Sequence, residues 1–222
     1  MKAIIFCFLT LPLAAQESLR YSINWASGLS LGEATLSSSP AKIAEGQPAL
    51  QFEMKMDASI PGFAVLDEFK SLASANYCSL EFNKSLAHGK RKSKEKVEFA
   101  KGEATRKSVE NGGGKTTFST PSCPKDALTF LQYARREIAL GKVPSSEPVN
   151  FGATYQVRFD YAGEQRIKVG DAPTQADRLI GFVKGPKSDF TFEIFFGRDA
   201  QRTPLLIKVP FSLGTFSMEL VR

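Results

Sequence analysis

Residues that commonly carry catalytic or metal chemistry are scarce in this chain of 222 residues, which has one histidine, one tryptophan and three cysteines. The histidine, His88, opens the run His88–Lys92, whose glycine and basic residues are typical of a surface turn. A catalytic histidine needs a positioned partner and a pocket, and a zinc site needs several spaced ligands. We therefore interpret His88 as a loop residue and expect a non-enzymatic protein without metal or cofactor.

The chain also lacks an apolar run long enough to cross a bilayer, which takes about 20 residues. Its N-terminal apolar run, Ala3–Leu13, follows Lys2 and precedes two alanines. A positive start, a short apolar stretch and a small-residue cleavage site are together typical of a secretory signal peptide. We predict that residues 1–15 are this signal, and that residues 16–222 form one exported, periplasmic domain without a transmembrane segment.

Cysteine is rare, and its placement fits export. Cys7 lies inside the predicted signal, so only Cys78 and Cys123 remain, 45 positions apart. An even pair in an oxidising compartment favours a structural disulfide, which would stabilise the domain by about 4 kcal/mol in the chain-entropy model. The alternatives are two buried thiols or a redox-active pair, but the chain has no Cys-x-x-Cys spacing to activate a thiol.

Two patterns resemble known sites but lack required parts. The run Gly112–Thr116 resembles a phosphate-binding loop, yet Val109 stands where the motif needs its first glycine, so we interpret the run as a hairpin turn. A glycosidase needs two carboxylates at a defined separation, which the sequence does not give. The scattered carboxylates include Asp67, Glu68, Asp160 and Glu164.

Alternation of apolar and polar residues dominates the exported part and predicts half-buried β-strands. The alternating segments are Leu50–Asp57, Tyr155–Tyr161, Glu164–Val169, Phe190–Phe196, Leu205–Phe211 and Phe216–Leu220. Between the second and third of these segments, Ala162 and Gly163 predict a tight hairpin turn. Many short strands separated by turn residues favour a sandwich or a barrel.

One segment, Lys125–Leu140, has helical spacing instead, with apolar residues every three or four positions. Ser122 and Pro124 suit its start and Gly141 suits its end. Cys123 would then lie at the helix N-terminus, where a disulfide would pin the helix to the sheet. The predicted fold is mainly β: a curved antiparallel sheet or open β-barrel with one amphipathic helix packed against it.

Five short segments carry a resemblance to a known family: Tyr21–Trp25, Leu31–Leu36, Asp126–Leu128, Tyr133–Arg135 and Arg202–Leu205. They resemble an exported bacterial family catalogued as domain of unknown function 3108, and the similarity covers nearly all of residues 16–222. That family is similar in outline to the half-open barrels of periplasmic lipoprotein carriers, which hold acyl chains against an apolar concave face. The resemblance implies this fold but provides no catalytic or binding residue to carry over.

Phenylalanine is abundant, at 18 residues against 5 tyrosines. If the sheet closes tightly, these rings fill a core, as buried apolar residues usually do. If the sheet stays open, the same rings would line a cleft for an acyl chain or an apolar peptide. The predicted cleft residues are Phe52, Leu131, Phe159, Phe192 and Phe196.

A basic segment is the clearest charge feature, formed by Lys90, Arg91, Lys92 and Lys94. It would attract an anionic envelope surface, such as lipid head groups, lipopolysaccharide phosphates or an acidic partner. The alternative is a solvated hairpin tip whose lysines discourage aggregation. Nucleic acid is not an expected partner, because no aromatic residues interleave the charges.

These observations predict a monomeric carrier or binding module for a lipid acyl chain or lipoprotein in the cell envelope. The alternative is a structural or protein-interaction component of the envelope without a small ligand. An enzyme would need polar groups that converge in a pocket, for which the sequence gives no convincing constellation.

Overall fold

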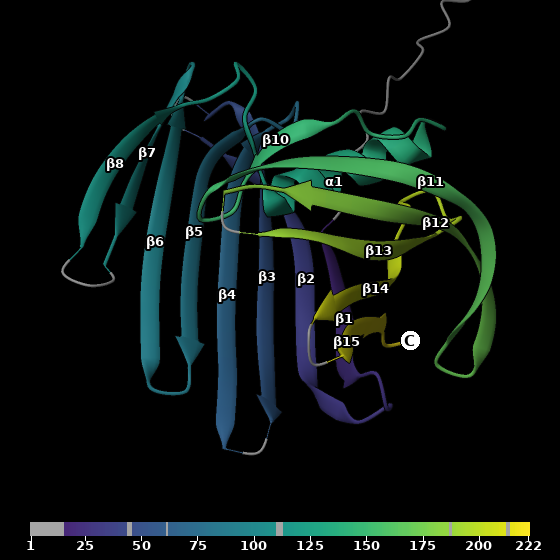
Figure 1. Cartoon of the computed structure of the whole chain (residues 1–222). Helices are drawn as coiled ribbons and strands as arrows, with labels where there is room; N and C mark the ends of the chain where they lie inside the picture. The colour runs from purple at the N-terminus through teal and green to yellow at the C-terminus, as the bar shows by residue number, and fades with distance from the viewer. Residues whose placement is uncertain (1–15, 44–45, 61, 110–112, 187, 212–213) are drawn as a thin grey trace, which may run out of the picture.

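The computed structural model describes residues 16–43, 46–60, 62–109, 113–186, 188–211 and 214–222. These residues form one sheet of 15 strands and one helix (Figure 1), which confirms the mainly β prediction. The predicted signal peptide lies outside the described residues.

The first eight strands follow one another as antiparallel hairpins. They are β1 (Glu17–Trp25), β2 (Ser30–Lys42), β3 (Pro48–Ile60), β4 (Phe63–Ser74), β5 (Ser79–His88), β6 (Arg91–Ala100), β7 (Glu103–Ser108) and β8 (Gly114–Ser119). The last of these hairpins corrects the predicted turn at Gly112–Thr116: Gly114, Lys115 and Thr116 lie in β8 and pair with β7, and residues 110–112 lie outside the described part.

The chain then forms a two-residue strand and the helix before six more strands complete the sheet. These are β9 (Lys125–Asp126), α1 (Ala127–Ala139), β10 (Glu147–Asn150), β11 (Thr154–Val169), β12 (Ala172–Lys184), β13 (Asp189–Gly197), β14 (Pro204–Phe211) and β15 (Gly214–Leu220). Strand β15 pairs with β1, so both halves join in one sheet whose edge strands are β8 and β9. The predicted strands are thereby confirmed, apart from one turn.

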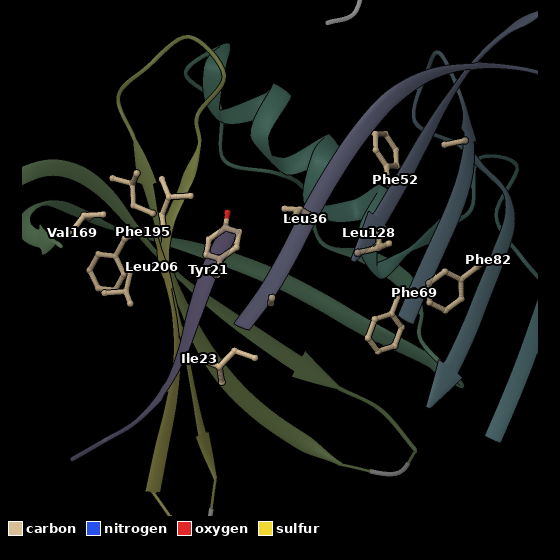
Figure 2. Close-up of a cluster of buried hydrophobic side chains, with 14 of the residues drawn as sticks. Tyr21, Ile23, Leu36, Phe52, Phe69, Phe82, Leu128, Val169, Phe195 and Leu206 are labelled. Atoms are coloured by element: carbon tan, nitrogen blue, oxygen red, sulfur yellow. The ribbon is translucent and has the colours of Figure 1, made fainter. Parts of the chain in front are cut away.

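The sheet curves around α1 (Figure 1), and we call the face on which α1 packs the inner face. Alternation along the strands gives this face its apolar side chains. Figure 2 shows Phe52, Phe69 and Phe82 from three adjacent strands gathered near Leu128 of α1. The opposite, outer face of β3–β7 carries ion pairs instead, such as Lys70 with Glu68 at 3.1 Å. A sheet with one apolar and one solvated face is expected for antiparallel strands.

The far edge of the sheet folds back onto its first half at Asp126. The backbone N–H of Ser79 on β5 donates to the carbonyl of Pro124 (2.8 Å), just before β9. The fully buried Asp126 carboxylate accepts hydrogen bonds from the hydroxyls of Ser71 (2.6 Å), Ser79 (2.6 Å) and Thr129 (2.9 Å). These bonds attach α1 and β9 to β4 and β5, so side chains and one backbone hydrogen bond, without a strand ladder, join the two parts of the open sheet here.

The predicted hairpin turn at Ala162 and Gly163 is wrong. The chain continues through both residues as one strand, β11, and its register with β12 shifts between Tyr161 and Glu164. Gly163 has φ +90°, a conformation that glycine tolerates, and such an irregularity bends a strand without ending it. The sequence signal for a turn therefore marks a bulge.

Beyond this bulge the β11–β12 hairpin curls over the outer face of β13–β15. The backbone N–H of Gly170, at its tip, donates to Glu219 Oε1 at 2.9 Å. Val169 packs with Phe195 and Leu206 (Figure 2). Leu206 pairs with Glu219, and Glu219 points to the face opposite that of its neighbour Leu220, which faces inward. The contact of Val169 with Phe195 and Leu206 therefore forms a second apolar layer on the outer face of the sheet.

The helix is confirmed, with a different start. Asp126 is the N-cap, because its side chain accepts from the backbone N–H groups of Leu128 and Thr129. Ser122 and Pro124 precede the extended β9, so Cys123 does not lie at the helix N-terminus as predicted. Gly141 ends the helix as expected, with φ +74° and a hydrogen bond from its N–H to Ile138.

The structure joins Cys78 and Cys123 in a disulfide. Cys78 lies in the β4–β5 turn and Cys123 lies just before β9. The bond therefore fastens the segment that leads into α1 to the first half of the sheet, close to the Asp126 network.

Candidate functional site

A cavity of about 630 Å³ opens between α1, β2 and β3 at one end of the curved sheet. The β4–β5 turn, the start of β1 and the β13–β14 loop complete its walls. Its lining residues are Gln16, Glu17, Ser38, Ser39, Leu50, Phe52, Tyr77, Gln132, Arg135, Arg136, Ala139, Ala200 and Gln201. Its volume lies within the usual range for small-molecule sites, roughly 300–1,000 Å³.

One wall of the cavity is apolar. Leu50 and Phe52 are two positions apart on β3, so both side chains lie on the inner face. Phe52 stacks against Tyr77, with ring centroids 6.2 Å apart. Leu131 of α1 is half-buried and packs against both apolar clusters of the protein. Of these side chains, the half-buried Leu50 can contact hydrocarbon in the cavity, because Phe52 is only 2% exposed.

The opposite wall is held by Arg135 of α1. Its Nη1 and Nη2 donate to the two carboxylate oxygens of Glu17 at 2.7 and 2.8 Å, and its Nε donates to the Gln201 carbonyl at 3.0 Å. Nη1 also donates to Gln132 Oε1 at 2.9 Å. All three guanidinium nitrogens are engaged and the residue is buried, so Arg135 fastens α1 to the start of β1 and to the β13–β14 loop.

Arg136 marks the rim of the cavity. Its guanidinium lies over the rings of Tyr77 and Tyr133, at 5.0 and 5.1 Å from their centroids. It also donates to Glu137 Oε1 through Nε and Nη2. The rings hold this cation in place beside the opening, because a guanidinium is attracted to an aromatic face.

The structure separates the five predicted cleft residues. Phe52 lines the cavity and Leu131 lies half-buried between the clusters, whereas Phe159 and Phe196 are buried among other side chains. Phe159 stacks on Phe130 of α1 at 5.6 Å and meets the half-buried Phe192 edge-on at 5.7 Å. Within the described part of the chain these five residues do not line one common cavity, and their role in ligand binding stays a prediction.

A second cavity, also of about 630 Å³, lies mainly over the outer face of β12–β15 and β1. Phe192 contributes to it, but most of its side chains are polar or charged, including Glu193, Lys208 and Glu219. Two of these are already engaged: Glu193 pairs with Arg178 at 2.6 Å, and Glu219 accepts from Gly170. By residue type this hollow is no more polar than the cavity beside α1, whose lining is also mostly polar; of the two, the one beside α1 is bordered by the helix.

The basic segment forms the tip of the β5–β6 hairpin and the start of β6. Lys90 lies in the turn, and Arg91 is the first residue of β6, aligned with His88. Lys92 and Lys94 alternate along β6 and are exposed on the outer face. An anionic contact by this segment stays a prediction.

His88 and the scattered carboxylates are placed apart from the cavity. His88 Nε2 lies 2.9 and 3.0 Å from the two oxygens of Asp67 on the neighbouring strand β4. The other three carboxylates each form an ion pair with a basic residue: Glu68 with Lys70, Asp160 with Arg158, and Glu164 with Arg198. No two of these carboxylates are paired with each other among the contacts of the described residues.

Sequence reasoning missed the polar side of the cavity. Gln132, Arg135 and Arg136 lie on α1, where the apolar stripe alone was used to predict packing. The available signal was that Gln132 and Arg135 fall on the apolar stripe of the helix, because such polar side chains are rarely buried unless partnered. The partners of Arg135 outside the helix come from β1 and the β13–β14 loop, more than 60 positions away.

Among the residues that the structure describes, no helix is long and apolar enough to span a bilayer. In the same part of the chain, no group of three or more His, Cys, Asp and Glu side chains is arranged to hold a metal ion.

Comparison with known proteins places the fold and the family. No curated protein matches the chain. A solved structure from Brucella abortus, described as a beta-barrel-like protein of domain of unknown function DUF1849, matches with a TM-score of 0.65 at 8% identity, over 96% of this chain and 98% of that one. This likeness shows the β-barrel-like fold alone. Residues 20–221 match the family described as "Protein of unknown function (DUF3108)", and the chain belongs to that family.

Proposed function

We propose that this protein is a non-enzymatic carrier or binding module for a lipid acyl chain or a lipoprotein in the cell envelope. The observation that carries the proposal is the cavity beside α1. It combines an apolar wall from β3 with a rim of polar and basic side chains from the helix. An amphiphile needs both surfaces, one for its chain and one for its head.

The energetics of burial support an acyl chain as the occupant. Each methylene removed from water contributes about 0.8 kcal/mol. Leu50 of the cavity is half-buried and packs against the same apolar cluster as Phe52, so hydrocarbon beside it would extend this apolar surface. About ten buried methylenes contribute about 8 kcal/mol, the free energy of micromolar binding before the cost of association is counted, so most of a long acyl chain must be buried.

Export to the periplasm is part of the proposal. The N-terminal pattern and the Cys78–Cys123 disulfide support it, because disulfides persist in oxidising compartments. Lipids and lipoproteins that cross this aqueous compartment would expose their acyl chains to water. A protein that covers these chains lowers the free energy of that exposure.

The test uses a cavity-filling variant. Ala139 lines the cavity at the exposed end of α1, so Ala139→Trp adds bulk at the opening without removing a core contact. Ala172→Trp, at an exposed position on β12 outside the cavity lining, is the matched control. We expect the wild-type protein and the control to bind a fluorescent fatty acid, and Ala139→Trp to bind it at least tenfold more weakly.

A wild-type protein that leaves the probe unbound would contradict the carrier proposal. Equal binding by all three proteins would contradict the choice of this cavity.

The second candidate is an envelope interaction protein without a small ligand. The observation in its favour is β8, an edge strand that pairs only with β7 and is exposed along most of its length. An exposed edge can accept a strand from a partner. Two results together would favour this candidate. The protein would bind no lipid probe, and a partner protein captured by the wild-type chain would not be captured by the variant Thr117→Pro in β8.

A further inference from the structure

We infer that one end of the curved sheet docks on an anionic lipid bilayer, where exposed apolar side chains enter the head-group layer and lysines contact the phosphates. We call this part of the molecule the docking end. Its residues are Leu29 between β1 and β2, Phe63 and Leu66 on β4, Lys90 in the β5–β6 turn and Lys92 on β6. The inference goes beyond the proposed carrier function and does not depend on it.

The docking end lies opposite α1, where the turns after β1, β3 and β5 are at the same end of the sheet (Figure 1). Strand β4 begins there at Phe63 and runs for 12 residues, roughly 35 Å, toward the helix side, where Tyr77 contacts the Arg136 guanidinium. The backbone N–H of Gly89, in the β5–β6 turn, donates to the Ala64 carbonyl at 2.8 Å. This bond joins the β5–β6 turn to the start of β4.

Three large apolar side chains are exposed at the docking end. Leu29 is 60% exposed, Phe63 is 42% exposed and Leu66 is 51% exposed. Gly32 of β2 pairs with Ala58 of β3, and Phe63 pairs with the residue two positions after Ala58. Leu29 lies three positions before Gly32, so Leu29 and Phe63 reach nearly the same level and can enter one lipid surface together.

The ring of Phe63 is supported by the neighbouring hairpin. It meets the His88 ring edge-on, with the ring centroids 6.3 Å apart. His88 is itself fixed, because its Nε2 lies 2.9 Å from Asp67 Oδ1. Aromatic rings favour the interface between membrane and water, and a ring that is already held in place loses little freedom when it enters that layer.

Lysines lie beside these apolar side chains. Leu66 aligns with Ala87 of β5, which aligns with Lys92 of β6, so one row across the outer face joins the apolar and the basic residue. Lys90 and Lys92 are exposed and form no ion pair among the described residues. Asp57 aligns with Leu66 from the other side and is the exposed carboxylate of this row. The two lysines therefore leave a positive excess beside Leu66.

This combination favours a lipid bilayer as the partner. A single apolar or electrostatic contact gives only weak membrane binding, whereas both together give stable binding. Each basic residue near an anionic surface strengthens binding about fivefold. The exposed side chains project from separate hairpin ends, which suits a fluid surface that deforms around each of them.

The test is sedimentation of the full exported chain with vesicles of phosphatidylglycerol and phosphatidylethanolamine, and with vesicles of phosphatidylcholine alone. Leu29→Ser/Phe63→Ser removes two apolar side chains from the docking end. The matched control, Leu140→Ser/Val143→Ser, removes two apolar side chains of similar exposure, 62% and 47%, from the helix side. Neither double variant changes the net charge.

We expect the wild-type protein and the control to bind the anionic vesicles equally, and at least tenfold more tightly than the phosphatidylcholine vesicles. Leu29→Ser/Phe63→Ser should bind the anionic vesicles at least tenfold more weakly, because burial of its apolar side chains is lost while its lysines remain. Phe63→Trp should keep the binding. Its fluorescence should shift to shorter wavelength on the anionic vesicles by more than that of the wild-type protein, whose one tryptophan is Trp25.

A wild-type protein that does not bind the anionic vesicles would overturn the inference, and so would equal losses from the two double variants. A Phe63→Trp spectrum that shifts no more than the wild-type spectrum would contradict insertion at this end, and it decides by itself if the double variant does not fold. Binding of a fluorescent fatty acid to the same proteins tests the carrier function separately, so the two proposals can fail independently.

Discussion

At the scale of single residues, Asp126 shows how one carboxylate organises the join between helix and sheet. It caps α1 through the N–H groups of Leu128 and Thr129, and it accepts from the hydroxyls of Ser71 and Ser79 across the interface. Complete burial raises the pKa of Asp126, and the hydrogen bonds that it accepts oppose this rise. Burial of this carboxyl group therefore outweighs the hydrogen bonds that favour its charged form.

We predict that Asp126→Ala lowers the free energy of unfolding by about 3 kcal/mol, because a helix cap is lost and buried hydroxyls lose a charged acceptor. Urea denaturation checks this loss, with the exposed Asp171→Ala as control.

The raised pKa means that the folded state binds the Asp126 proton more tightly than the unfolded chain does. The contribution of Asp126 to the free energy of unfolding is therefore greatest at a pH below the ordinary carboxyl pKa. It is lost as the pH rises through the pKa that Asp126 has in the folded state. A pH profile of stability that is the same in Asp126→Asn and in the wild-type protein would contradict this assignment.

A second residue-scale prediction concerns Gly181. A Cβ at this position would lie 2.3 Å from the ring of Phe192, which rests on the glycine across the β12–β13 pair. We expect Gly181→Ala to destabilise the protein by about 2 kcal/mol, a typical cost of overpacking. In thermal denaturation the double variant Gly181→Ala/Phe192→Leu should recover part of this loss. A double variant whose losses simply add would argue against the contact.

At the scale of elements, the disulfide ties the segment before β9 to the β4–β5 turn across 45 positions. The chain-entropy model assigns about 4 kcal/mol to a loop of this size. We predict that Cys78→Ser/Cys123→Ser loses stability of this order in urea denaturation, and that a reducing agent destabilises only the wild-type protein. A wild-type protein equally stable with and without reductant would refute the prediction.

The β5–β6 hairpin tip is the element predicted to meet an anionic surface. Lys90, Lys92 and Lys94 are exposed and form no ion pair among the described residues. We expect their triple change to glutamine to weaken binding to anionic vesicles by about 1 kcal/mol per residue in a flotation or sedimentation assay.

The matched control for this hairpin tip changes three lysines that are already paired with glutamates on the outer face: Lys55, Lys70 and Lys107. If both triple variants lose the same amount of binding to anionic vesicles, the effect comes from net charge alone, and the hairpin tip has no specific role.

The elements also show what the sequence can and cannot predict. Alternation predicted the strands well, because burial of one face imposes a period of two. The Ala162–Gly163 signal was misread as a turn, since a bulge and a turn both use a glycine with positive φ, and only the distant contact of Gly170 with Glu219 distinguishes them. The helix start was misplaced for a similar reason: the partners of Asp126 lie on β4 and β5.

At the scale of the whole molecule, a continuous sheet curves around one helix and leaves space beside it. The cavity depends on residues from β1, β3, α1 and the β13–β14 loop, so its volume is a property of the curvature. Local patterns place Phe52 and Phe159 on the same face but do not reveal that both are buried, Phe52 beside the cavity and Phe159 against Phe130. Sequence analysis could therefore propose an apolar cleft without locating it.

The central claim, that the protein carries an acyl-chain ligand, is tested most directly by native mass spectrometry of the protein isolated from cells that export it, followed by organic extraction. We expect a stoichiometric adduct whose mass matches an extracted acyl lipid, present in Ala172→Trp and lost in Ala139→Trp. A wild-type protein of bare chain mass, with no acyl lipid in the extract, would contradict the account.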